Sequence, residues 1–433
     1  MALFNIPDKS YPWLENLPQD WIIKPLHSIS KIEQGKAHEA YIDEDGEFIC
    51  VNSKFISSEG ISIKRCNKKI TSVNTFDILI VMSDLPNGKA LAKAFYVVND
   101  VEKYAVNQRV CKVSILNGDP KFIFYQMSRN PYFIRMDDGI NQTHLPNSVF
   151  KNFPVVFPST DKQKSISQFI DSETKRIDNL ISEKKAFIKL LKEKRQSLIT
   201  HFVTKGLDPN APMKDSGVEW IGEVPEHWKV GDLRYYASLN TGATPSRDIK
   251  EYWNGNIPWI STSEVKYKDI HFSNEYITET ALNNCSVKLA EPETLLMAMY
   301  GQGVTRGRVA ILKVYASYNQ ACVAIKVSSN VYVKYLYNFY ISAYKELRQV
   351  GNLTSQMNLN SDLVGRFKIL IPPMNEQLKI VKEINNKVHL IDDLVNDTLS
   401  SISLLKERRS ALITAAVTGK IVVTEANNKE EGI

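Results

Sequence analysis

The sequence predicts an α+β protein built as a pseudo-twofold tandem duplication, in which two mixed α/β domains are separated by two long coiled-coil helices. Three observations predict this class. Blocks of sequence recur at a constant offset, and two long segments without proline carry an apolar stripe of helical period. The remaining segments are short, rich in β-branched and aromatic residues, and bounded by turn residues.

The composition is that of a folded protein, because 43% of the 433 residues are hydrophobic and 24% are charged. No apolar run reaches the roughly 18 residues of a membrane-spanning helix, and the first residues lack the features of a secretory signal, so we expect a cytoplasmic protein. The net charge of +6 permits nucleic-acid binding without requiring it. The five cysteines are dispersed and form no C-x-x-C pair, so we expect reduced structural thiols.

Two blocks of the chain recur. The segments LLKEKRQSLITHFVT (190–204) and LLKERRSALITAAVT (404–418) lie 214 positions apart and are identical at ten of fifteen positions. The same offset relates Pro158 and Gln163 to Pro372 and Gln377. Near the start of each copy, four bulky residues recur 207 positions later: Trp13, Pro18, Trp21 and Leu26 return as Trp220, Pro225, Trp228 and Leu233. The second copy has therefore gained a net seven residues between the two blocks, since 214 minus 207 is 7.

The segment from about 161 to 204 and its copy each predict a long amphipathic helix, because apolar residues recur three and four positions apart. At about 1.5 Å per residue, a 40-residue helix spans roughly 60 Å and would act as a spacer. Each helix is the nearest available partner for the other's stripe, and packing alone explains the stripe. The predicted packing residues are Ile166, Ile170, Ile177, Leu180, Leu191 and Leu198 in the first helix, and Ile380, Ile384, Ile391, Leu394, Leu405 and Leu412 in the second.

The other regions of the two copies predict mixed domains. Strand-like segments such as TFDILIVM and FKILIPP alternate with helical patterns near 121–130 and 331–347. Glycine, prolines and polar residues after the first helix predict an exposed connector. The predicted boundaries are 1–157 for the first domain, 158–206 for the first helix, 207–222 for the linker, 223–373 for the second domain, 374–420 for the second helix and 421–433 for a C-terminal tail.

Candidate catalytic motifs are incomplete. Asn130-Pro131-Tyr132-Phe133 approaches the N/D-P-P-Y/F/W motif of DNA amino-methyltransferases but lacks its second proline, and the glycines at 301 and 303 form only a weak approach to a cofactor loop. Asp248 with Glu264 and Lys266 could be read as a metal-nuclease triad, but such patterns are common in a chain this rich in charge. No P-loop and no paired histidines occur. We therefore predict a non-catalytic chain that binds no metal.

Loops of the mixed domains carry side chains suited to reading DNA. TGATPSRDIKEYWNGNIPW (241–259) and YGQGVTRGR (300–308) combine glycine, hydroxyls, glutamine and arginine. Glycine allows close backbone approach, arginine can bind phosphate or guanine, and glutamine can bind adenine. The corresponding stretch of the first domain is IVMSDLPNGKALAK (80–93), and NQRV (107–110) parallels NQAC (319–322). Taken alone, each loop is more typical of an ordinary surface turn, but the presence of such loops on both duplicated domains favours a role in reading DNA.

Together these features resemble the specificity subunits of type I restriction-modification systems, over nearly the whole chain. The resemblance is carried by KDSGVEWIGEVPEHWKV (214–230), the TGATPS opening, the P-x4-Q entry to each helix and the two LLKE(K/R)R helix ends. The family pattern is two target-recognition domains held apart by two antiparallel spacer helices. The first domain departs from it, because EQGKAHEAYIDEDGEF (33–48) offers no clear counterpart of GATPS.

The resemblance implies that each domain reads one half of a bipartite, asymmetric DNA site, and that the helices set the half-site spacing and dock two adenine-methylating subunits. Motor-endonuclease subunits would complete the restricting complex, and S-adenosylmethionine, ATP and Mg²⁺ would bind to the partner subunits. A self-sufficient methyltransferase or nuclease and a structural coiled-coil adaptor remain the alternatives. The predicted DNA-binding residues are Thr241, Thr244, Ser246, Arg247, Tyr300, Gln302, Thr305, Arg306 and Arg308 in the second domain, and Gln34, Lys36, Ser83 and Lys89 in the first.

Overall fold

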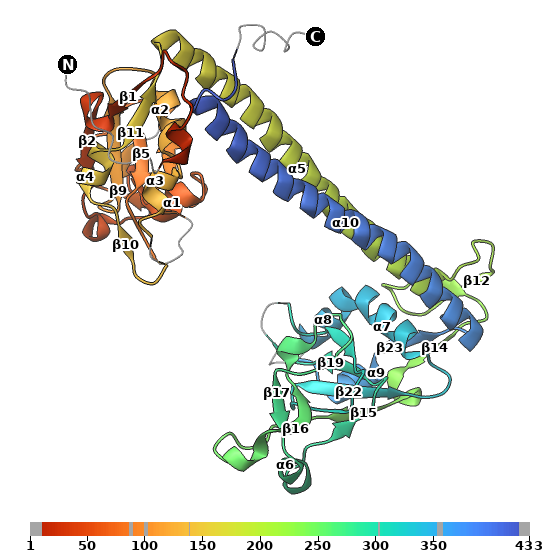
Figure 1. Cartoon of the computed structure of the whole chain (residues 1–433). Helices are drawn as coiled ribbons and strands as arrows, with labels where there is room; N and C mark the ends of the chain where they lie inside the picture. The colour runs from red at the N-terminus through yellow and green to blue at the C-terminus, as the bar shows by residue number, and fades with distance from the viewer. Residues whose placement is uncertain are drawn as a thin grey trace. The chain divides into compact units, whose positions relative to one another are not determined.

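The chain divides into two compact units, labelled by element in Figure 1. Unit 1 comprises Met1–Glu183 and Ser401–Ile433, and unit 2 comprises Lys184–Ser400. No helix in the described part of the chain is both long and apolar enough to cross a membrane. The structure, a computed structural model, describes residues 11–85, 90–98, 103–137, 139–301, 304–352 and 358–423.

Unit 1 is built on a four-stranded antiparallel sheet in the order β2-β9-β5-β7. A smaller sheet, β4-β3-β8, pairs β3 with β8 in parallel, and β1–β11 and β6–β10 form two-stranded ladders. The strands are β1 (Ile22–Pro25), β2 (Ser30–Gln34), β3 (Phe48–Val51), β4 (Arg65–Cys66), β5 (Ile78–Val81), β6 (Ser83–Asp84), β7 (Ala94–Tyr96), β8 (Tyr104–Val106), β9 (Val110–Ile115), β10 (Thr143–His144) and β11 (Pro154–Phe157). The short helices are α1 (Ser53–Ser57), α2 (Pro120–Met127), α3 (Pro131–Ile134) and α4 (Asn147–Lys151).

Unit 2 has the same plan. Its main antiparallel sheet has the order β15-β22-β19-β20, and its second sheet, β17-β16-β21-β18, again contains one parallel pair, β16 with β21. The strands are β12 (Met213–Asp215), β13 (Glu223–Pro225), β14 (Lys229–Asp232), β15 (Ala237–Thr241), β16 (Trp253–Ile260), β17 (Glu275–Ile277), β18 (Leu289–Ala290), β19 (Leu295–Ala298), β20 (Val309–Ile311), β21 (Ala316–Tyr318), β22 (Cys322–Val327) and β23 (Lys368–Ile371). The short helices are α6 (Glu279–Asn284), α7 (Val333–Ser342), α8 (Tyr344–Asn352) and α9 (Ser361–Arg366).

The matching strand orders confirm the predicted α+β tandem duplication. The β1–β11 ladder corresponds to β14–β23, and the parallel pair β3–β8 corresponds to β16–β21. The second copy has a longer β16 and an additional strand, β18. The predicted linker is not wholly irregular, because β12 within it pairs with β13.

Two long helices accompany these units: α5 (Thr160–Lys205) and α10 (Met374–Val417). Each unit contains one end of α5 and one end of α10. In unit 1, Ile166 and Ile170 of α5 share a buried cluster with Ala416 and Val417 of α10. In unit 2, Ile199 and Val203 of α5 share a buried cluster with Ile380 and Ile384 of α10. Within each unit, the end of one long helix therefore packs beside the start of the other, as in the predicted antiparallel arrangement.

The seam between the long helices differs in register from the predicted stripe. Leu180 and Leu394 are 39% and 47% exposed, so they do not pack in the seam between the two helices. The buried positions are instead Ile181 and Ile188 in α5 and Ile402 in α10, with Thr174 and Thr398 as polar members. Each threonine hydroxyl donates to the carbonyl four residues earlier, at 2.6 Å, which makes its burial possible. In α5 the seam steps four residues from Ile177 to Ile181, where the prediction took a step of three to Leu180. Ile166, Ile170, Ile177, Ile380, Ile384 and Ile391 are buried as predicted, and Leu191, Leu198, Leu405 and Leu412 are half-buried.

Arginines also contact the opposite helix, at equivalent places in the two copies. Arg195 Nε lies 3.0 Å from Asp392 Oδ1 in unit 2, and Arg409 Nε lies 3.1 Å from Asp178 Oδ1 in unit 1. Both members of one pair map onto the other at the offset of 214, since 195 plus 214 is 409 and 178 plus 214 is 392. The duplication therefore preserved a pair of cross-helix ion pairs.

We expect each of these ion pairs to contribute little to stability, because the side chains are partly exposed. In a double-mutant cycle of Arg195→Ala and Asp392→Ala, the coupling free energy should be about 0.2–1 kcal/mol. Urea unfolding of the unaltered protein, the two single variants and the double variant measures this coupling free energy. A coupling above about 2 kcal/mol would show that the pair is more strongly desolvated than its exposure indicates.

The P-x4-Q motif at the start of each helix has a structural cause. Gln163 and Gln377 are fully buried. Gln163 Nε2 donates to the Pro158 carbonyl at 2.8 Å, and its Oε1 accepts from the Asp119 N–H at 2.8 Å. Gln377 makes the same two kinds of bond, to the Pro372 carbonyl and from the Tyr332 N–H. Each glutamine therefore ties the helix start to the loop that leads into α2 or α7.

Candidate nucleic-acid interface

Three chain segments of unit 2 meet at one end of its main sheet, where β15 and β19 end and β22 begins. β22 runs antiparallel to both β15 and β19, so that Thr241 lies beside Val323 and Ala298 beside Cys322. The segments that leave β15 and β19 therefore emerge beside the segment that enters β22. We call this end of the sheet the recognition edge of unit 2. It brings Thr241, Thr244, Tyr300 and Gln320 to one end of the sheet, and the hydroxyl of Thr244 donates to Gln320 Oε1.

Close backbone approach at this edge requires Gly242. A Cβ atom on Gly242 would lie 2.1 Å from the carbonyl oxygen of Tyr318 and 2.5 Å from that of Asn319. The neighbouring residue uses the same approach, because Ala243 N–H donates to the Tyr318 carbonyl at 3.1 Å. The glycine of the predicted TGATPS loop therefore serves packing within the protein.

The loop after Gly242 rests on two tryptophans. Trp259 Nε1 donates to the Ala243 carbonyl and Trp253 Nε1 donates to the Ser246 carbonyl, both at 3.0 Å. Arg247 lies over the Trp253 ring, 3.8 Å from its centroid, and pairs with both carboxylate oxygens of Glu275. The hydrogen bonds from Arg247 hold the pKa of Glu275 below its usual value. Thr241, Thr244, Ser246 and Arg247 are exposed, although Arg247 is occupied by this pair.

The second loop of the recognition edge gives a mixed result. Tyr300 is exposed, Thr305 and Arg308 are half-buried, and Gln302 lies outside the described residues. Arg306 is only 8% exposed and its Nη2 donates to the Arg348 carbonyl at 3.1 Å, so its predicted role as a DNA contact is corrected to support of the loop. Burial is the reason, since the sequence gives no sign of which arginine of TRGR faces inward.

Unit 1 has an equivalent recognition edge. β9 runs antiparallel to both β2 and β5, placing Gln34 beside Cys111 and Val81 beside Val110. Gln34 Nε2 donates to the Gln108 carbonyl at 3.1 Å, and Lys36 is exposed. Ser83 is buried and its hydroxyl accepts from Gln142 Nε2, which argues against its predicted DNA contact. Lys89 lies outside the described residues.

The sequence did contain a counterpart of GATPS that the prediction missed. Gly35 and Gly242 are 207 positions apart, the offset of the first repeated block. A Cβ on Gly35 would lie 2.2 Å from the Asn107 carbonyl, the same kind of collision as at Gly242. The predicted parallel between NQRV and NQAC also has a structural basis. The main-chain carbonyl of Asn107 accepts from the Val110 N–H at 2.9 Å, and that of Asn319 accepts from the Cys322 N–H at 3.0 Å. Arg109 and Gln320, both exposed within these motifs, are interface candidates that the prediction left out.

Residues of the incomplete catalytic motifs have structural roles. Asn130 caps α3 by accepting from the Tyr132 N–H. Glu264 closes a capping box with Ser261 and also accepts from the Asn274 N–H at 2.9 Å. In the described ranges, no three histidine, cysteine or acidic side chains gather as metal ligands.

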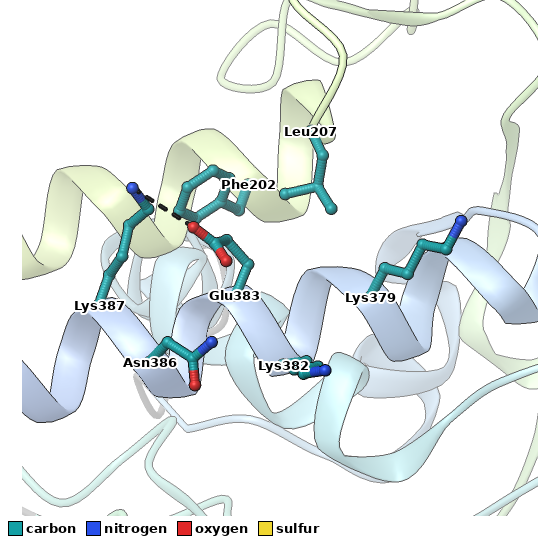
Figure 2. Close-up of a pocket in the computed structure, with 7 residues that line it drawn as sticks. All are labelled: Phe202, Leu207, Lys379, Lys382, Glu383, Asn386 and Lys387. Atoms are coloured by element: carbon teal, nitrogen blue, oxygen red, sulfur yellow. Dashed lines mark ion pairs between the residues drawn. The ribbon is translucent and has the colours of Figure 1, made fainter.

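Figure 2 shows a basic recess of unit 2 that the duplication does not repeat. Lys379, Lys382 and Lys387 line it from α10, and Lys387 pairs with Glu383 at 3.3 Å near the Phe202 ring of α5. At the offset of 214, the three lysines correspond to a serine, a glutamine and a glutamate: Ser165, Gln168 and Glu173. This recess is therefore specific to the second copy, unlike the recognition edges.

The two units define a protein with two recognition modules, which present different side chains on one frame. The family model described as the type I restriction modification DNA specificity domain matches residues 18–190 and again 225–402. The chain belongs to this family and is a specificity subunit of a type I restriction-modification system.

Similar proteins cover almost the whole chain. The MjaVIII specificity subunit of Methanocaldococcus jannaschii is 22% identical over 427 residues, 95% of each chain. The EcoR124I/EcoR124II specificity subunit of Escherichia coli is 26% identical over 295 residues, covering 67% of this chain and 68% of its own. The fold is shared with the HsdS subunit of Thermoanaerobacter tengcongensis, with a TM-score of 0.53 at 14% identity, covering 94% of this chain and 98% of that one. A chain from a study of assembly and conformational transition in the type I R-M system has a TM-score of 0.72 at 14% identity, covering 94% of this chain and 99% of its own.

Proposed function

We propose that unit 1 reads one half of a bipartite, asymmetric DNA site and that unit 2 reads the other half. The observation that carries the proposal is that both units bring three segments to the same edge of the same sheet, with different side chains. One edge offers Gln34, Lys36 and Arg109, and the other offers Thr241, Thr244 and Gln320. The same strand arrangement with different side chains at its end suits two half-sites of different sequence.

The partner subunits would supply the chemistry. In this proposal two methylating subunits dock on the long helices, carry S-adenosylmethionine and modify adenine, and motor-endonuclease subunits carry ATP and Mg²⁺. The exposed leucines of α5 and α10 support docking there, because large apolar side chains on a helical pair are commonly covered by a partner. The chain itself would contribute no catalytic residue.

Methylome sequencing tests the recognition role. A host expressing this chain with its cognate methylating subunit should acquire a bipartite motif with methyladenine in both halves, and a host lacking the chain should not. Methylation by this chain alone would favour a self-sufficient methyltransferase. If an active methylating partner and the folded chain produced no new motif, a structural adaptor would be favoured.

The spacer role predicts a change in motif length. Removing one heptad from each helix, residues 181–187 and 395–401, keeps the two seams in register because the segments are equivalent at the offset of 214. Seven helical residues span about 10 Å, so the unread gap between half-sites should shorten by up to about three base pairs. The methylome measures the gap directly. An unchanged gap with normal assembly would remove the spacer role, and removal of the heptad from α5 alone provides the mismatched control.

A further inference from the structure

Each unit has a basic recess at the junction of a long helix with the recognition edge, and the two recesses are equivalent. The unit 2 recess, of about 510 Å³, is lined in part by Arg195, Thr200, Arg308, Ser342 and Lys345. The unit 1 recess, of about 390 Å³, is lined in part by Lys93, Ser128, Lys406, Arg409 and Thr414. At the offset of 214, Arg195, Thr200 and Ser128 correspond to Arg409, Thr414 and Ser342.

A further cation occupies the same place in both recesses. Arg308 immediately precedes β20, and its carbonyl accepts from Ala298, the last residue of β19, at 2.9 Å. Lys93 immediately precedes β7, and its carbonyl accepts from Val81, the last residue of β5, at 3.0 Å. Since β19 and β5 end at the recognition edges, each recess adjoins the edge of its own unit.

Both recesses have an excess of positive charge. No carboxylate is among the described residues that line either one. Arg195, Arg409 and Lys93 each pair with a carboxylate of a residue outside the lining. The positive charge offered to an anion therefore comes mainly from Arg308 and the exposed Lys345 in unit 2, and from the exposed Lys406 in unit 1. Such a surface attracts anions.

The unit 2 recess also contains donors without partners. Arg308 Nε and the Tyr267 hydroxyl are buried, and neither has a hydrogen-bond partner in the part of the chain that the structure describes. Burial raises the pKa of the Tyr267 hydroxyl, so it remains a donor. A buried donor without an acceptor costs about 1–3 kcal/mol, and a bound acceptor toward which these side chains turn would recover part of that cost.

The geometry points to one phosphodiester group of the DNA backbone as the ligand of each recess, next to the half-site that the unit reads. The residues at the recognition edges differ between the units, whereas three positions of the recess recur with the same residue type, an arginine, a threonine and a serine, so the recess should contact something that both half-sites share. The backbone is identical in the two halves, and the bases are not. This inference rests on the proposed function, and it assigns Arg308 to the backbone rather than to a base.

Salt dependence of DNA binding tests the inference. The complex of the full chain with its methylating subunit is titrated with duplexes containing the methylated motif and with scrambled duplexes, over a range of salt concentrations. Lys345→Gln and Lys406→Gln should each lower the affinity for both duplexes by a similar factor, about threefold to tenfold. Each should also reduce the slope of log K against log salt by about 0.9. The double variant should reduce it by about twice as much. Tyr267→Phe should weaken binding without changing the slope.

Matched controls are available in the same units. Lys229→Gln in unit 2 and Lys164→Gln in unit 1 remove exposed lysines that line neither recess, and they should leave affinity and slope unchanged. Unchanged binding by the recess variants would overturn the inference, and so would a loss confined to the cognate duplex, which indicates base reading. A loss of assembly with the methylating subunit would assign the recess to a protein partner instead. If the unaltered complex showed no sequence preference, the proposed function would fail, while the slopes would still report on the recesses.

Discussion

Replacing Gln377 by leucine is expected to lower the free energy of unfolding of unit 2 by at least about 2 kcal/mol. The substitution removes the partner of the Pro372 carbonyl and that of the Tyr332 N–H, which lie on buried and half-buried residues. It also removes a bond to the carbonyl of Asn330, an exposed residue whose carbonyl water can solvate. Each buried group left unsatisfied costs about 1–3 kcal/mol. Urea unfolding followed by hydrogen exchange would measure the loss and locate it in unit 2.

The equivalent substitution in the first copy provides a comparison. Gln163→Leu should destabilise unit 1, because it removes the partners of the Pro158 carbonyl and the Asp119 N–H. Gln168→Leu changes an exposed glutamine of the same helix and should change stability by less than about 0.5 kcal/mol. A small effect of Gln377→Leu, close to that of Gln168→Leu, would show that water or a shifted backbone replaces the lost bonds.

Replacing Gly242 by alanine is expected to abolish reading of one half-site while the other half is still read. The new methyl group would collide with the carbonyls of Tyr318 and Asn319, so the loop that carries Thr244 and Arg247 must move. Forcing a group into a packed site costs about 1–3 kcal/mol of stability, and each base that the displaced loop no longer reads should weaken specific DNA binding by a similar free energy. Binding to duplexes with either half-site scrambled would separate the two halves.

Gly35→Ala makes the reciprocal prediction for the other half-site, because its Cβ would meet the Asn107 carbonyl at 2.2 Å. Gly365→Ala is the control. Its Cβ would make an ordinary 3.4 Å contact with the Arg234 side chain, within helix α9, and DNA binding should not change. If Gly242→Ala reduced binding to both scrambled duplexes equally, the loop would not be specific to one half-site.

The duplication and the long helices could be predicted from the sequence because both leave local, repeated patterns. Identical residues at a constant offset are visible in the sequence alone, and an apolar stripe in a segment without proline predicts a helix. The register of the seam could not be predicted in full. A buried threonine is acceptable only when its hydroxyl has a partner, and Thr174 and Thr398 find theirs on their own helices.

The recognition edges were predicted only in part. The loops at 241–259 and 300–308 were identified from residue type, but which arginine is buried depends on contacts with distant segments, such as that of Arg306 with Arg348. The need for glycine at 35 and 242 likewise arises from carbonyls more than 70 residues away in the chain. Comparing the offsets would have found Gly35, because it obeys the same spacing as Trp13 and Trp220.

The division of the chain between the units has a consequence for its synthesis on the ribosome. Unit 2 is one continuous stretch, so all of its parts have been made before the last residues are added. Unit 1 needs Ala416 and Val417 to complete its buried cluster, and Gly419 packs against Pro18 and Trp21. The domain that is translated first is therefore finished last, and its apolar surface stays uncovered until the ribosome reaches the end of α10. Nascent chains that stop short of this point should be especially prone to aggregation and to capture by chaperones.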